Sequence, residues 1–276
     1  MKNFLFSDKK NVKLVVGVLV LFLIFFVNLA HYLHLNVFFV LLFISLLVYL
    51  MSVIIVNFKF NFAEAFGLLL FPSILCFFAF YFTITIFIPL FNLHSGVVFA
   101  LLSNFLYIII SFILYASLLN ISIIRASYID NVPLAQFSYT INYMLSVVCS
   151  YLVFSVIFME FSSLPLIIIA SCVFSFILFM QILYFLGEYN LYDIVLYSFF
   201  ALILVTNVSA LLVFYPIIGF LSALVLSICV YIYEGILIHI KRGELSKYNI
   251  FEYSFLIILV FVCLLVFPRW GIVGGI

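Results

Sequence analysis

Charged residues are scarce in this sequence. Of its 276 residues only 7% are Asp, Glu, Lys or Arg, whereas 70% are hydrophobic. A soluble domain has about 25% charged and about 45–50% apolar residues, so no ordinary water-exposed surface can be built from this chain. The net charge of +1 also excludes the basic face that a nucleic-acid partner requires. The medium around the chain is therefore predicted to be lipid.

Cysteine pairs and signature motifs are missing as well. The sequence has no C-x-x-C pair, no phosphate-binding loop, no aspartate-rich metal motif and no nucleophile elbow. The five cysteines are widely spaced within apolar runs, and we expect them to be unpaired, small apolar side chains: Cys76, Cys149, Cys172, Cys229 and Cys263. No cofactor, metal site or catalytic motif is indicated.

Long apolar runs fill most of the chain instead. A membrane-spanning helix needs about 20 apolar residues, and about nine runs meet this requirement. We therefore predict an all-α, polytopic integral membrane helical bundle, with residues 1–276 forming one membrane-embedded domain. The predicted spans are Leu14–Ala30, Leu35–Asn57, Phe66–Phe91, Gly96–Leu118, Ile141–Met159, Leu164–Leu186, Ile194–Phe214, Ile217–Ile240 and Ile250–Phe267.

The basic residues indicate how these spans are oriented. If the N-terminus is cytoplasmic and the spans alternate, every Lys and Arg except Arg269 falls on the cytoplasmic side. Basic residues beside spans favour that side, so we predict a plasma-membrane protein with an external C-terminus. This distribution of basic residues also supports a turn at Pro216 and Gly219, because without that turn Lys241 and Arg242 would lie on the external side. The abundance of Phe, Tyr, Ile and Asn suggests a low-GC, bacterial genome.

The longest segment between apolar runs is residues 119–140. On the predicted topology it is cytoplasmic, and it contains Arg125, Asp130 and Pro133. Pro133 interrupts helical structure, so either an extended loop or a short interfacial helix fits the pattern. A protein partner of a membrane subunit would dock on this stretch.

Glu234 is the one carboxylate predicted to lie well inside a span, because the others, Glu252 included, are at or near a membrane boundary. An ionisable residue inside a membrane marks an ion or substrate site in many proteins. The alternative is a side chain that reaches the membrane surface beside Lys241 and Arg242. Because Gly235 lies on a face of small residues in the same span, we predict that Glu234 faces the bundle and has Tyr or Ser hydroxyls as neighbours.

Polar and small residues also recur at helical spacing in two spans. The fourth span has a face of hydroxyl and amide side chains, which are candidate lining residues of a pathway or pocket: Ser103, Asn104, Tyr107, Ser111 and Tyr115. The eighth span has a face of small residues that is typical of close helix packing: Gly219, Ala223, Ser227 and Gly235. Val225 is expected on another face of this span, and Gln181 and Asn207 are expected to be buried amides that need partners.

Three functions from different classes remain open. The first is transport or lipid and small-molecule handling, in which a substrate meets the hydroxyl face of the fourth span and Glu234. The second is a non-catalytic membrane subunit that docks a partner through residues 119–140. The third is a membrane-embedded transferase that uses Glu160 with His31 or His34 at the outer side.

Overall fold

The computed structural model describes residues 36–55, 70–87, 89, 105–118, 120, 135–186, 190–215, 217–243 and 246–266. The chain divides into two compact units, residues 1–145 and 146–276, and the boundary falls within one helix. All the regular structure in the described residues is helical, as the sequence predicts. The first predicted span, Leu14–Ala30, lies outside the described residues.

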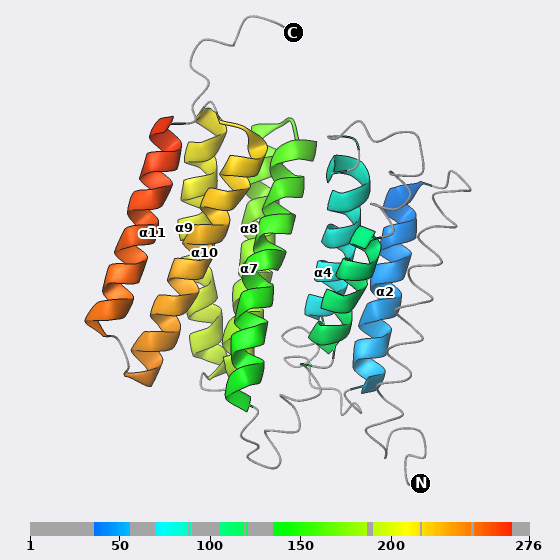
Figure 1. Ribbon diagram of the computed structural model, residues 1–276, viewed down its shortest axis with the longest axis horizontal. Coiled ribbons are helices and arrows are strands. Elements are labelled where there is room, and N and C mark those ends of the chain that lie inside the picture. The colour runs from blue at the N-terminus through cyan, green and yellow to red at the C-terminus, as the bar shows by residue number, and fades with distance from the viewer. Residues whose placement is uncertain are drawn as a thin grey trace, which may run out of the picture. The chain divides into compact units, whose positions relative to one another are not determined.

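The first unit contains α2 (Val37–Ile55), α4 (Leu70–Tyr81), the π-helix η2 (Phe82–Phe87) and a helix over Phe105–Leu118 (Figure 1). The α2 and α4 helices pack against each other. The rings of Phe38 and Phe77 meet edge to face between them, with centroids 5.6 Å apart. This unit is held by apolar side chains, since Leu41, Ile44 and Phe80 are almost completely buried.

The predicted third span is not one uniform helix. It changes from α-helix to π-helix at Phe82. Two threonine hydroxyls donate to backbone carbonyls four residues earlier, Thr83 to Ala79 and Thr85 to Tyr81, each at 2.8 Å. Hydroxyls that bond to backbone groups inside a helix compete with its own ladder, which accounts for the locally widened helix.

The second unit contains most of α7 (Ala135–Glu160), followed by α8 (Leu164–Leu186), α9 (Leu191–Phe214), α10 (Gly219–Arg242) and α11 (Lys247–Val266). Neighbours in sequence pack as neighbours in space, with α8 on α9, α9 on α10 and α10 on α11 (Figure 1). The turn predicted at Pro216 and Gly219 is confirmed, because α9 ends at Phe214 and α10 begins at Gly219. The Tyr215 hydroxyl donates to the Leu264 carbonyl of α11 at 2.8 Å.

The assignment of residues 119–140 to a loop or interfacial helix is wrong at its C-terminal end. The α7 helix begins at Ala135, six residues before the predicted start. It begins two residues after Pro133, and a proline is compatible with the entry to a helix but not with its interior. Asn120 and Ser138 are both buried and bond to each other. The Asn120 amide donates to the Ser138 carbonyl at 2.9 Å, and the Ser138 hydroxyl donates to the Asn120 side chain.

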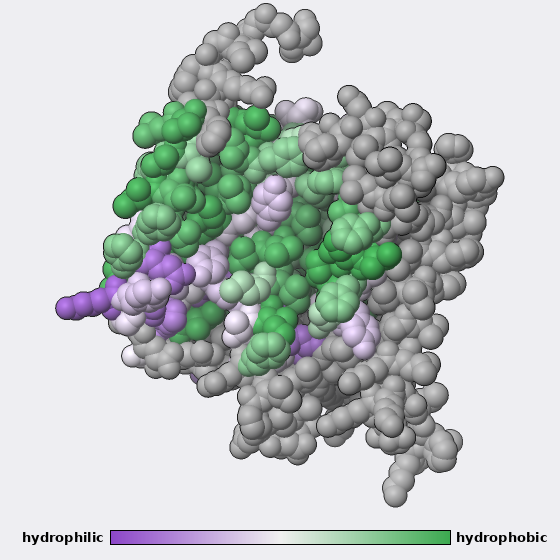
Figure 2. All heavy atoms as spheres, viewed as in Figure 1, coloured by the Kyte–Doolittle hydropathy of each residue, from purple (hydrophilic) through white to green (hydrophobic). Residues whose placement is uncertain are grey.

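Six helices in the described part of the chain are long and apolar enough to cross a membrane. They are Leu70–Phe87, Phe137–Glu160, Leu164–Tyr184, Leu191–Phe214, Gly219–Ile240 and Lys247–Val266, and two shorter apolar helices cover Val37–Leu50 and Phe105–Leu118. The surface of the second unit is largely hydrophobic, and hydrophilic atoms gather where α10 ends and α11 begins (Figure 2). The count of nine spans stays a prediction.

Candidate functional site

Glu234 lies in the interior of the second unit. Its side chain is 1% exposed, and its Oε2 accepts a hydrogen bond from the Ser146 hydroxyl of α7 at 3.0 Å. Its other oxygen, Oε1, is buried and has no hydrogen-bond partner among the described residues. The prediction that Glu234 faces the bundle with a hydroxyl neighbour is confirmed. A buried carboxylate with one unsatisfied oxygen is costly, so its retention calls for an explanation beyond packing.

At Gly219, the first residue of α10, this helix comes close to the C-terminal end of α7. A Cβ atom on Gly219 would lie 2.8 Å from Met159 Sδ and 3.2 Å from the Phe158 carbonyl oxygen. Ala223 and Ser227 are also buried, and the Ser227 hydroxyl donates to the Ala223 carbonyl within its own helix. The small-residue face is therefore a site of close packing, as small residues at helical spacing predict.

Val225 is buried although it lies on another face of α10 from the small residues. This side chain is 3% exposed, and its neighbour Leu226 is fully buried. The physical cause is that α10 packs against α9 and α11 as well as approaching α7. It therefore buries an arc that is wider than the small-residue face alone.

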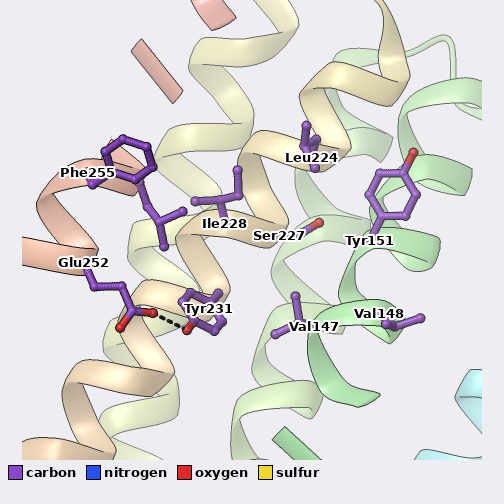
Figure 3. A pocket seen from close by; sticks show the side chains of 10 residues that line it. Val147, Val148, Tyr151, Leu224, Ser227, Ile228, Tyr231, Glu252 and Phe255 are labelled. Atoms are coloured by element: carbon purple, nitrogen blue, oxygen red, sulfur yellow. Dashed lines mark hydrogen bonds between the residues drawn. The ribbon is translucent and has the colours of Figure 1, made fainter. Parts of the chain in front are cut away.

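A groove lies between α7, α10 and α11, and two of these helices, α7 and α10, also hold Ser146 and Glu234. Its volume is about 430 Å³, which is within the range of about 300–1,000 Å³ for small-molecule sites. Figure 3 shows the side chains that line it on the three helices. The lining residues are Val147, Val148, Tyr151, Leu224, Ser227, Ile228, Tyr231, Glu252, Phe255 and Leu256.

The groove is apolar along most of its length and polar at one end. The Tyr231 hydroxyl donates to Glu252 Oε1 at 2.7 Å, which joins α10 to α11 (Figure 3). The Tyr253 ring packs behind this pair, with its centroid 6.3 Å from that of Tyr231 and 6.2 Å from that of His239. Sequence reasoning placed Glu252 only at the membrane boundary. The groove itself was not predicted, although Glu252 and Phe255 are three residues apart and therefore share one face of the helix.

The hydroxyl face of the fourth span is described only in part. Tyr107 and Ser111 are buried on the same side of the helix, and the Tyr107 ring lies 5.8 Å from that of Phe80. Tyr115 is half-buried. Ser103 and Asn104 lie outside the described residues. The predicted lining residues are thus divided between the units, with Tyr107, Ser111 and Tyr115 in the first and Glu234 in the second. Their role in a pathway stays a prediction.

The two predicted buried amides differ. Gln181 is completely buried, and neither its oxygen nor its nitrogen has a hydrogen-bond partner in the described part of the chain. Asn207 is exposed, so the expectation that it is buried is wrong. Its amide donates to the Ile203 carbonyl at 2.8 Å, which satisfies the donor within its own helix and allows the side chain to face outward.

The residues of the transferase hypothesis are described only at one end. Glu160 is exposed at the C-terminus of α7, whereas His31 and His34 lie outside the described residues. No group of three or more His, Cys, Asp or Glu side chains that could hold a metal occurs among the residues that the structure describes. All five cysteines are free, which confirms the prediction that they are unpaired.

The described helices are apolar and long enough to span a membrane, and many large hydrophobic side chains are exposed on their surface. These two features define the chain as a helical membrane protein. Comparison with protein-family models, with curated proteins and with solved structures finds no match.

Proposed function

We propose that this protein is a transporter of small molecules or lipids in which Glu234 binds the coupling proton. The observation that carries this proposal is the buried carboxylate with one hydroxyl partner and one oxygen without a partner among the described residues. Carboxylates inside spans form proton relays and ion sites in pumps and transporters.

The ligands around Glu234 favour a proton over a metal cation. Calcium takes six to eight oxygen ligands and magnesium takes six in near-octahedral geometry. Glu234 and Ser146 together supply at most three oxygen atoms, whereas a proton needs only the carboxylate. The groove between α7, α10 and α11 is the candidate site for the transported molecule, because two of its three helices, α7 and α10, also hold this pair.

Proteoliposomes that contain the purified protein and an internal pH dye test the proposal. After a proton gradient is imposed, compounds from a panel of apolar and amphiphilic small molecules are added in turn. We expect at least one compound to collapse the gradient with the wild-type protein and not with Glu234→Gln. The control is Glu160→Gln, which removes a carboxylate from an exposed position and should behave as wild type.

Two outcomes contradict the proposal. One is a Glu234→Gln variant that collapses the gradient as fast as the wild-type protein. The other is a wild-type protein that responds to no compound, which would favour the non-catalytic subunit. The partner site of that subunit would be the stretch within residues 119–140, most of which lies outside the described residues.

A further inference from the structure

We propose that the groove between α7, α10 and α11 binds a cationic amphiphile, namely an ammonium group joined directly to an apolar chain, with the ammonium at Glu252. This inference rests on the proposed function in one respect, namely that the amphiphile is the molecule that the protein transports. The binding itself depends on the groove and not on Glu234.

The carboxylate of Glu252 supplies the charge that such a ligand complements. Glu252 is half-buried, and within the described part of the chain its carboxylate is bonded to the Tyr231 hydroxyl and is paired with no cation. An ammonium group has three N–H donors and no acceptor, so it can bond to a carboxylate that already accepts one hydrogen bond. Charge-assisted bonds of this kind are stronger than neutral ones.

The walls of the groove supply a place for the chain. From Tyr231 the groove continues along α10 through Ile228 to Leu224, a distance of about 10 Å at 1.5 Å per residue. Phe255 and Leu256 of α11 and Val147 of α7 also line the groove. Apart from Tyr151 and Ser227, whose hydroxyl donates to the Ala223 carbonyl of its own helix, this lining is apolar, and the Tyr231–Glu252 pair lies at one end. It matches a molecule that has the same division.

The position of Glu252 favours an ammonium on the chain over a phospholipid headgroup. Glu252 is five residues into α11 from Lys247, about 7.5 Å along the axis. It therefore lies next to the apolar wall, and the group that it binds must be attached close to the chain. In a phospholipid the phosphate occupies that position, and two negative groups side by side repel each other.

Binding of radiolabelled dodecylammonium to the full-length protein in phosphatidylcholine nanodiscs tests the inference, with empty nanodiscs as the background. Dodecanol and dodecanoate have the same chain and serve as competitors. We expect excess unlabelled dodecylammonium to displace the label at least about tenfold more effectively than either competitor. Glu252→Gln should weaken binding about fivefold to tenfold, and Tyr231→Phe should weaken it less.

Three further variants test whether the amphiphile binds in the groove and at Glu252. Leu224→Trp should block binding by filling the groove, and Glu160→Gln should bind as wild type. Equal binding by wild type and Glu252→Gln, or equal competition by dodecanol, would overturn the inference. Glu234→Gln should still bind dodecylammonium, so loss of proton coupling with retained binding distinguishes failure of the carboxylate from failure of the groove.

Discussion

The neighbouring helices α10 and α11 are both apolar enough to cross a membrane, yet they are buried very differently. Half of the α10 span is buried, compared with 6% of the α11 span. The α10 helix has Gly219, Ala223 and Ser227 at its contacts, whereas α11 presents large side chains such as Phe251, Phe255 and Phe261 outward. Lipid is as apolar as these side chains, so hydrophobicity does not drive helices together in a membrane. Small and polar residues therefore decide which helix is packed.

The largest effect should come from removing a buried ring rather than an exposed one. Phe179 is fully buried, and its ring packs edge to face on that of Tyr233 of α10 at 5.2 Å. Phe179→Ala should lower the free energy of unfolding in detergent by about 3 kcal/mol, mainly through the cavity that it leaves. Phe261→Ala on α11, where the ring is 62% exposed, should change it by less than about 0.5 kcal/mol. Equal losses would mean that α11 is also covered.

A smaller effect is expected from filling the close approach of α10 to α7. Gly219→Leu would place a side chain where Met159 and the Phe158 carbonyl already lie, and overpacking costs about 1–3 kcal/mol. Val262→Leu on α11 is the matched small-to-large change at an exposed position, and it should leave thermal unfolding unchanged. A Gly219→Leu protein as stable as the wild type would remove the case for close packing.

The smallest of these effects concerns a hydroxyl. Ser146→Ala removes the described hydrogen-bond partner of Glu234, and leaving a buried acceptor unpaired should cost about 1 kcal/mol. The same change at Ser254 of α11 removes a hydroxyl that is exposed and bonded to its own helix at Ile250. It should have no measurable effect on stability. If both variants unfold alike, the Ser146–Glu234 contact contributes nothing to the fold.

The sequence predicts the type and extent of the helices better than it predicts the contacts between residues far apart in the chain. Run length and composition predict α8 at the bounds Leu164–Leu186 that the structure has. They do not predict that α7 begins at Ala135, because the contact in its first turn, Ser138 with Asn120, joins residues that are 18 positions apart in the sequence. Helical spacing predicts the close packing at Gly219, because this packing depends on the small size of the residue at that one position.

Which way a polar side chain faces was harder to predict. Glu234 and Asn207 are both polar residues within apolar spans, and both were expected to be buried. Only Glu234 is buried, because Ser146 is within reach, whereas the Asn207 amide is satisfied by the Ile203 carbonyl of its own helix. A polar side chain that forms a hydrogen bond within its own helix can face outward. Sequence spacing does not show whether its hydrogen-bond partner lies in the same helix or in another one. The groove was missed for the same reason, since it needs three helices to form.

The most direct test of the account is labelling of Glu234 by dicyclohexylcarbodiimide, an apolar reagent that modifies protonated carboxyl groups in apolar surroundings. The account predicts modification of Glu234, identified by mass spectrometry, with labelling that slows as the pH rises. Glu234→Gln should lose this modification, and Glu160→Gln should keep it. Absence of labelling at Glu234 over the whole pH range in which the protein stays folded would contradict the claim that this carboxylate binds a proton.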